Sequence, residues 1–170
     1  MKRESVLQLL ILAATAALGY FFWESTKVTI VTVGDTAPDF EVRTESGLTL
    51  TRSQFGGKVL VVNFWATWCP PCVEEIPSLE QFHKMFKDSG VVVLGISVDK
   101  NEAKYKNFLK RFNVSFATAR DPEATIPVSF GTWRYPETYV INREGKVVQK
   151  IISNANFTDE SMIRFIKSLL

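Results

Sequence analysis

Continuously apolar segments alternate with amphipathic segments along most of this chain. Residues 59–64 and 91–98 are almost entirely apolar, which is typical of strands that are buried on both faces of a parallel sheet. Each is followed by a segment with apolar residues at helical spacing, residues 72–88 and residues 102–111. Strands that alternate with helices in this way predict a layered α/β domain.

Shorter segments have the patterns of hairpins and of a final helix. The expected hairpins pair residues 40–43 with 48–51 and residues 139–142 with 146–152, each across a turn that contains glycine. Residues 53–57 are predicted to form a short helical turn that ends in glycine, and residues 116–119 are predicted to form a short strand. Thr158 is the expected N-cap of a last helix that ends at Leu170.

The N-terminus has a separate pattern. An apolar run from Val6 to Trp23, interrupted only by Gln8 and Thr15, is long enough to cross a bilayer. Lys2 and Arg3 precede this run and favour a cytoplasmic N-terminus, with the rest of the chain facing the periplasm or cell exterior. We therefore expect an N-terminal membrane anchor or signal at residues 1–24, a tether at residues 25–33 and one domain at residues 34–170.

A cleaved signal peptide is the alternative for this segment, because Ala14-Thr15-Ala16 offers a small-x-small cleavage site. Cleavage there would leave Leu18 to Trp23 as an exposed apolar end, which favours an uncleaved single-pass anchor in the cytoplasmic membrane. Under either interpretation, the chain from Glu24 onward is exported.

Composition narrows the classes of function. The chain has 170 residues, enough for one domain and an extension, and its 46% hydrophobic content can supply a core. Twenty basic residues against 18 acidic ones give a net charge of +2 without a basic run, so we expect no nucleic-acid partner. Two cysteines and one histidine offer little material for a metal site, so no metal and no cofactor are expected.

The two cysteines lie in the motif Trp68-Cys69-Pro70-Pro71-Cys72. A disulfide across so short a loop gains little from loop-closure entropy, which favours a bond that opens and closes over a structural one. Cys69 follows a predicted strand and lies at the start of a predicted helix, where the macrodipole favours a thiolate. Because the thiolate is the attacking species in disulfide exchange, we expect Cys69 to be the nucleophile. Cys72, one turn deeper, is the expected resolving thiol.

The segment Phe64-Trp65-Ala66-Thr67-Trp68-Cys69-Pro70-Pro71-Cys72 resembles the active-site segment of thioredoxin-fold proteins. The resemblance is to the membrane-anchored TlpA/ResA-like thiol–disulfide oxidoreductases of bacteria. Three further matches follow in order: Ala37-Pro38-Asp39-Phe40, Glu75-Ile76-Pro77 and Pro136-Glu137-Thr138-Tyr139-Val140-Ile141. The resemblance covers roughly residues 33–170. It implies a thioredoxin-like fold, with a central mixed sheet flanked by helices, and the activity of a protein-disulfide oxidoreductase.

The resemblance also assigns roles around the cysteines. Pro136 matches the cis-proline that faces the cysteines in this fold, and Tyr135 before it would offer backbone groups to an extended substrate peptide. Trp68 is expected beside the sulfurs, where it would shield one side of the site.

A proton-transfer group is expected near Cys72. Asn63 stands where thioredoxins carry a buried aspartate, and an amide cannot titrate. Glu75 lies three residues after Cys72, on the same helical face, and the TlpA/ResA-like group has a glutamate there, so it is the candidate. His83 is a lone histidine, expected to be solvated and without a catalytic role.

Two other functions stay open at this point. A peroxiredoxin is one, because residues 37–40 also resemble that family, but Ala66 stands where peroxiredoxins carry a threonine three residues before the reactive cysteine. A copper-binding metallochaperone is the other, because two thiolates can hold Cu(I), although copper-delivering relatives use a longer cysteine spacing and a distant histidine.

By resemblance, the expected partners are protein substrates with disulfides, such as apocytochrome c or copper-site proteins of a terminal oxidase. A transmembrane thiol reductase is the expected electron donor. The protein is expected to act as a reductant.

Overall fold

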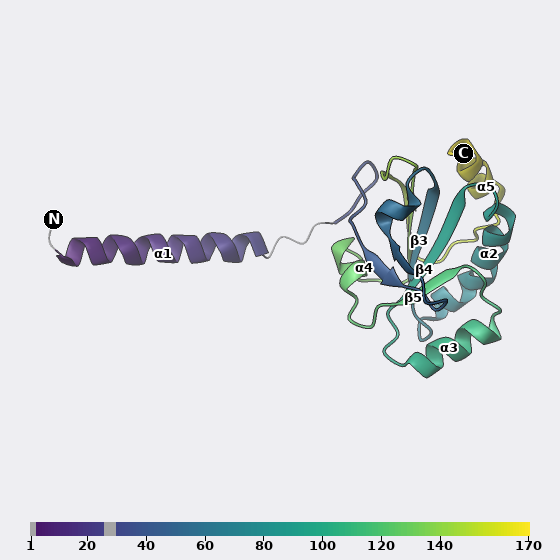
Figure 1. Ribbon diagram of the computed structural model, residues 1–170, viewed down its shortest axis with the longest axis horizontal. Helices are drawn as coiled ribbons and strands as arrows, with labels where there is room; N and C mark the ends of the chain where they lie inside the picture. The colour runs from purple at the N-terminus through teal and green to yellow at the C-terminus, as the bar shows by residue number, and fades with distance from the viewer. Residues whose placement is uncertain (1–2, 26–29) are drawn as a thin grey trace.

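The computed structural model describes residues 3–25 and 30–170. Figure 1 shows a long N-terminal helix, α1 (Arg3–Ser25), set apart from a layered domain of strands and helices. The segment Glu4–Trp23 of this helix is long and apolar enough to cross a membrane, and none of it is buried within the structure. The expected apolar N-terminal helix is therefore present. Its length and composition fit a membrane anchor and equally a signal sequence.

Five strands form a mixed sheet in the order β5-β4-β3-β6-β7. The strands are β3 (Val59–Trp65), β4 (Val91–Ser97), β5 (Ala117–Arg120), β6 (Glu137–Ile141) and β7 (Val147–Ile152). The first three run parallel, β6 runs antiparallel to β3, and β7 runs antiparallel to β6. Every residue of β3 and β6 is buried, because helices and loops cover both faces at the centre of the sheet. The central mixed sheet expected from the sequence is confirmed.

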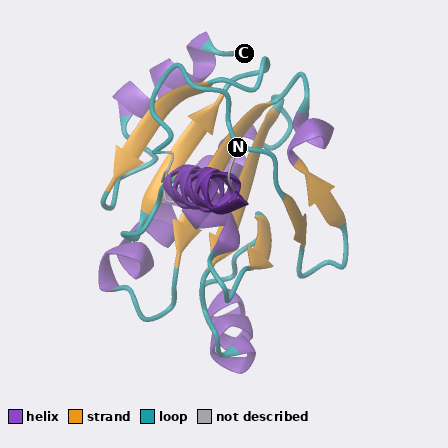
Figure 2. Ribbon diagram, turned by 90° about the vertical axis from the view of Figure 1, so that its left-hand side faces the viewer, coloured by secondary structure: helices purple, strands orange, loops and turns teal. Residues whose placement is uncertain are grey.

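Alternate residues of β3 enter two separate cores, as the period of two in a strand requires. Val59, Val61 and Trp65 face the core that is built with the helices α2 (Pro70–Phe86), α3 (Glu102–Arg111) and α5 (Glu160–Ser168). Leu60, Val62 and Phe64 face the second core. Figure 2 shows the strands of the sheet side by side with helices around them.

The second core is covered by smaller elements. These are the hairpin β1 (Glu41–Arg43) and β2 (Thr49–Thr51), the 3-10 helix η1 (Arg52–Phe55) and the short helix α4 (Thr125–Ser129). Both expected hairpins, β1 with β2 and β6 with β7, are confirmed by their antiparallel pairing. Helix α4 could not be predicted from the sequence, because its five residues include Pro127 and are too few to show a helical period.

The N-cap prediction for the last helix is wrong. Asp159, not Thr158, is the N-cap residue of α5, and its side chain makes no capping hydrogen bond. The Thr158 hydroxyl instead donates to Asn156 Oδ1 at 2.6 Å, and Asn156 Nδ2 donates to Asp159 Oδ1 at 2.7 Å. Both candidate capping groups are thus held in a turn that precedes the helix.

Residues 26–29 of the expected tether lie outside the described residues. Val31, inside the expected tether, is already buried in the domain. Its N–H donates to the Phe130 carbonyl at 3.1 Å, and its own carbonyl accepts from Lys150 Nζ at 3.1 Å. The described chain is therefore attached to the domain from Val31 onward.

Candidate functional site

The loop after β3 brings the two cysteines to the N-terminus of α2. Cys69 is the N-cap residue, and its Sγ accepts a hydrogen bond from the Cys72 N–H at 3.3 Å. Pro70 and Pro71 occupy the start of the helix, where a missing N–H removes no helical hydrogen bond. The cysteines form a disulfide with their Cα atoms 5.3 Å apart. Cys69 keeps 5% exposure and Cys72 none, so Cys69 is the outer sulfur.

The buried carboxylate of Asp99 holds the turn that leads into Cys69. It accepts hydrogen bonds from the Thr67 N–H at 2.9 Å, from Thr67 Oγ1 at 2.6 Å and from Ser97 Oγ at 2.7 Å. Asp99 follows β4, which lies parallel to β3, so the carboxyl ends of both strands meet at the same edge of the sheet. Asp99 therefore positions the cysteine loop from the neighbouring strand.

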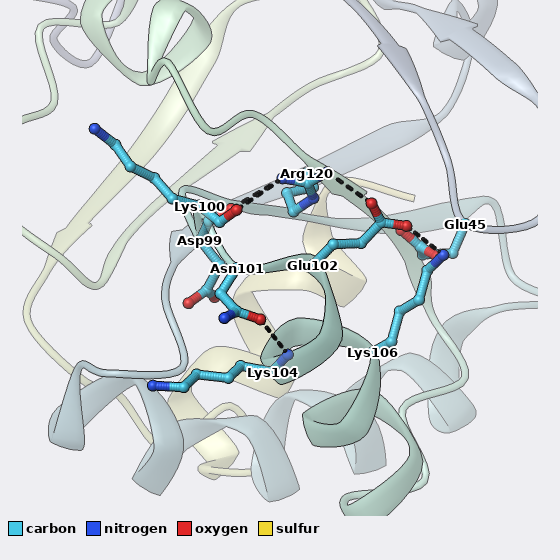
Figure 3. A network of polar contacts seen from close by, with 8 residues as sticks. All are labelled: Glu45, Asp99, Lys100, Asn101, Glu102, Lys104, Lys106 and Arg120. Atoms are coloured by element: carbon cyan, nitrogen blue, oxygen red, sulfur yellow. Dashed lines mark hydrogen bonds and ion pairs between the residues drawn. The ribbon is translucent and has the colours of Figure 1, made fainter.

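A charged network on the far side of Asp99 supports its backbone. Arg120 donates to the carbonyls of Asp99 at 3.4 Å and Lys100 at 3.3 Å, and it pairs with Glu102 at 3.2 Å (Figure 3). Glu102 also pairs with Lys106 at 2.5 Å. This support could not be predicted from the sequence. The only available signal was an acidic residue directly after a buried strand, a pattern that on its own does not name its partner.

Glu75 is buried one turn after Cys72 in α2, with 2% of its surface exposed. Its Oε1 accepts from Asn63 Nδ2 at 2.7 Å, and its Oε2 accepts from the Ala155 N–H at 3.2 Å. Burial raises the pKa of Glu75 from its usual 4.5 to about 7, although both hydrogen bonds act in the opposite direction. The carboxyl can therefore gain or lose a proton near neutral pH. Its neighbour Glu74, by contrast, is exposed.

Asn63 reaches Glu75 from the middle of β3. Besides the bond to Glu75, its Nδ2 donates to Thr138 Oγ1 at 2.9 Å, and Asn63 and Thr138 are paired residues of β3 and β6. Its Oδ1 is buried and has no hydrogen-bond partner. Asn63, which stands where thioredoxins carry an aspartate, is thus hydrogen-bonded directly to Glu75, the candidate proton-transfer group.

The second loop of the site carries the expected cis-proline. The Tyr135–Pro136 peptide bond is cis and lies directly before β6. The ring of Trp68 meets the ring of Tyr135 edge-on, with centroids 6.2 Å apart. This contact joins the cysteine loop to the proline loop. Trp68 is 63% exposed, so most of its surface faces solvent.

Comparisons with known proteins decide the family. The sequence profile of the AhpC/TSA family matches residues 33–150. Thiol-disulfide oxidoreductase ResA of Geobacillus thermodenitrificans (strain NG80-2) is 32% identical over 162 residues, which cover 94% of this chain and 92% of that protein. The chain belongs to the AhpC/TSA family, among its ResA-like thiol–disulfide oxidoreductases. The ResA of Bacillus subtilis (strain 168) is 30% identical over 95% of this chain and 89% of its own length.

A solved structure supports the same assignment. The thiol:disulfide interchange protein, a thioredoxin family protein from Chlorobium tepidum TLS, superposes with a TM-score of 0.70 at 29% identity. The match covers 81% of this chain and 97% of that one. The expected thioredoxin-like fold and the expected protein-disulfide oxidoreductase activity are therefore confirmed.

The expectation that His83 is solvated is wrong. The side chain is half-buried on α2, edge-on to Phe116 with ring centroids 6.2 Å apart, and burial lowers the pKa of His83. It lies eleven residues after Cys72, about 16 Å along a helix, so it is outside the oxidoreductase site. Among residues 3–25 and 30–170, no group of three histidine, cysteine, aspartate or glutamate side chains could hold a metal.

Glu75 should make the stability of the oxidised protein depend on pH. Because its pKa is about 7 in the folded protein and usually 4.5, the folded state keeps a proton that the unfolded chain has lost between these values. The free energy of unfolding should therefore fall as pH rises from about 4.5 to about 7, by up to about 3 kcal/mol, and then level off.

Denaturant unfolding at a series of pH values measures this effect. The disulfide keeps both cysteines from titrating, and subtracting the profile of Glu75→Gln from that of the wild type removes all other groups. A difference that does not change with pH would show that Glu75 ionises normally in the fold.

Proposed function

We propose that this oxidoreductase reduces disulfides of exported proteins at the outer face of the cytoplasmic membrane. The observation that carries the proposal is the Cys69–Cys72 pair at the N-terminus of α2, with the buried carboxyl of Glu75 one turn further along. The outer sulfur meets the substrate, and the inner sulfur and the acid stay out of solvent.

The first step is attack by the reduced enzyme. The Cys69 thiolate, favoured by the helix N-terminus, attacks one sulfur of the substrate disulfide. A bond forms between Cys69 Sγ and that sulfur, the substrate S–S bond breaks, and the other substrate sulfur leaves as a thiolate. The product of this step is a mixed disulfide.

The second step needs a proton acceptor next to Cys72. The Cys72 thiol gives its proton to the ionised Glu75 carboxylate, and the resulting thiolate attacks Cys69 Sγ. The Cys69–Cys72 bond forms, the mixed disulfide breaks, and the second substrate sulfur leaves. Two electrons have then moved from the cysteine pair to the substrate. A pKa of about 7 suits Glu75 to this exchange, since a general base works best near ambient pH.

Trp68, Tyr135 and Pro136 form the substrate-binding part of the site. The exposed Trp68 offers an apolar surface, and its contact with Tyr135 fixes the two loops relative to each other. In this proposal the backbone of Tyr135 pairs with an extended substrate peptide, in the manner of strand addition. A hollow of about 380 Å³ beside Trp68, lined also by Thr67 and Val98, extends this surface toward α3.

Helix α1 supports a location at the membrane. Residues 4–23 would span the bilayer once, with the N-terminus in the cytoplasm and the domain in the periplasm or outside the cell. A reductant in an oxidising compartment needs electrons from the cytoplasm, so a transmembrane thiol reductase is the proposed donor. Apocytochrome c with its haem-binding cysteines, or copper-site proteins of a terminal oxidase, are the proposed substrates.

A trapping experiment tests this function. The Cys72→Ala variant of the full chain cannot resolve the mixed disulfide, so it should accumulate substrates bound through Cys69 in the membrane fraction. Non-reducing gels and mass spectrometry identify them, and Cys69→Ala is the matched control. The captured chain should have the mass of the whole sequence. Equal capture by both variants, or a chain that begins near Ala17 in the soluble fraction, would count against the proposal.

A further inference from the structure

The hydrogen bonds around Glu75 suit only its ionised form. Both carboxyl oxygens accept from donors, Oε1 from Asn63 Nδ2 at 2.7 Å and Oε2 from the Ala155 N–H at 3.2 Å. A protonated carboxyl carries an O–H that needs an acceptor, and neither of these partners provides one. A site that takes up this proton therefore needs a partner that can present an acceptor to the carboxyl O–H.

Asn63 is the partner that can change. The Ala155 donor is a backbone N–H and is fixed, whereas a side-chain amide presents donors at one end and an acceptor at the other. The acceptor end of Asn63, Oδ1, is buried without a hydrogen-bond partner, so a half-turn of the amide breaks no hydrogen bond at that end and moves the two Nδ2 donors there. Thr138, the second group that Nδ2 contacts, has a hydroxyl that can either accept or donate.

We propose that the Asn63 amide turns with the protonation of Glu75, so that Asn63 is a positioning residue for the proton-transfer step. With Glu75 ionised, Nδ2 donates to Glu75 Oε1 and Thr138 Oγ1, as the structure shows. With Glu75 protonated, Oδ1 takes the place of Nδ2 and accepts from the carboxyl O–H and from the Thr138 hydroxyl. Each state then has matched donors and acceptors on the side of the amide that faces Glu75.

This inference rests on the proposed role of Glu75 as the acceptor of the Cys72 proton. An aspartate at position 63 would offer no donor to an ionised Glu75, and an apolar residue would offer no partner to either form. An amide can serve both forms, which explains why a group that cannot titrate occupies this position beside a group that does.

Few other charges face Glu75. Helix α2 and its N-cap carry the two cysteines and the exposed Glu74. The residues of β3, of β6 and of the segment after β7 that form the hydrogen-bond network of Glu75 are uncharged. Glu137, also on β6, pairs with Lys150 at 2.9 Å on the opposite face of the sheet. In the oxidised protein the cysteines do not titrate, so Glu75 can be followed alone.

Nuclear magnetic resonance of the oxidised full chain in detergent micelles tests the proposal. Carbon labelling of glutamate carboxyls reports the titration of Glu75, and nitrogen labelling of asparagine amides reports Asn63. The nuclear Overhauser contact between the Asn63 amide protons and the Thr138 methyl group should be strong above the pKa of Glu75 and lost below it, with the same midpoint. A contact that stays unchanged through the titration of Glu75 would overturn the proposal.

Two variants add a readout that a purely structural role would not affect. Asn63→Asp keeps the shape, removes both donors and adds a second carboxyl, so the lost hydrogen bond and the repulsion between the two carboxylates should together raise the pKa of Glu75 by at least about one unit. Thr138→Val should change this pKa less, because the hydroxyl serves both states. An Asn63→Asp variant with the wild-type Glu75 pKa would contradict the inference.

These results separate the inference from the proposed function. Normal disulfide reduction with a fixed Asn63 amide would overturn the turning amide and leave the function intact. A Glu75→Gln variant that reduces substrates at the wild-type rate would instead remove the proposed catalytic role of Glu75, whichever way the amide behaves.

Discussion

Alanine in place of Cys69 should lower the rate of protein-disulfide reduction to the uncatalysed background. Cys69 is the outer sulfur at the helix N-terminus, and the fully buried Cys72 cannot reach a protein disulfide in its place. The rate is measured with a protein disulfide as substrate and a small thiol as the electron source. Cys72→Ala is the informative partner variant, because it should still complete the first half-reaction and then stop.

A matched control guards against a change in fold. Glu74→Gln alters an exposed residue of the same helix and should leave the rate within a factor of about two, since exposed substitutions change free energies by less than about 0.5 kcal/mol. If Cys69→Ala retained a substantial part of the wild-type rate, Cys72 or a group outside the pair would have to be the nucleophile.

Replacement of Asp99 by alanine should lower the free energy of unfolding by at least about 3 kcal/mol, because a buried donor that loses its acceptor costs about 1–3 kcal/mol. Three hydrogen bonds from Thr67 and Ser97 lose their acceptor together. The turn before Cys69 should loosen as well, so disulfide reduction should slow even under conditions where the variant is fully folded.

Denaturant unfolding and the reductase assay measure the two effects of Asp99→Ala. Asp39→Ala is the matched control, because that carboxylate pairs with Arg52 at 2.6 Å but is 82% exposed, and exposed ion pairs contribute about 0–1 kcal/mol. Equal losses of stability in the two variants would show that the Asp99 hydrogen bonds do not hold the loop.

The position of the cysteine pair could be predicted from the sequence because the signals for it are local. The cysteine motif between a continuously apolar strand and an amphipathic helix places Cys69 at a helix N-terminus, where the structure has it. The spacing of Glu75 from Cys72 places both on one helical face, and both are buried. Period and spacing can place residues that lie on one element next to one motif, whereas the role expected for Glu75 also came from the family resemblance.

Features that depend on contacts between distant segments could not be predicted from the spacing of residues in the sequence. Asp99 meets Thr67 only because β3 and β4 lie side by side, and Asn63 meets Glu75 only because α2 packs on β3. His83 is a further example. Its polar neighbours in the sequence predicted a solvent-exposed side chain, but on α2 it packs against Phe116. The contacts of these three side chains depend on the pairing of distant strands and on the packing of helices against the sheet.

The reduction potential of the Cys69–Cys72 pair, measured by equilibrating the full chain with glutathione, tests the central claim most directly. Strong oxidants of this fold have an unusually stable reduced form, whereas here Pro70 and Pro71 add no charge or side-chain donor and an ionised Glu75 disfavours a thiolate. We therefore predict a potential near that of thioredoxin, about −270 mV. A potential near that of DsbA, about −120 mV, would show that the protein oxidises its partners and would contradict the proposed direction of electron flow.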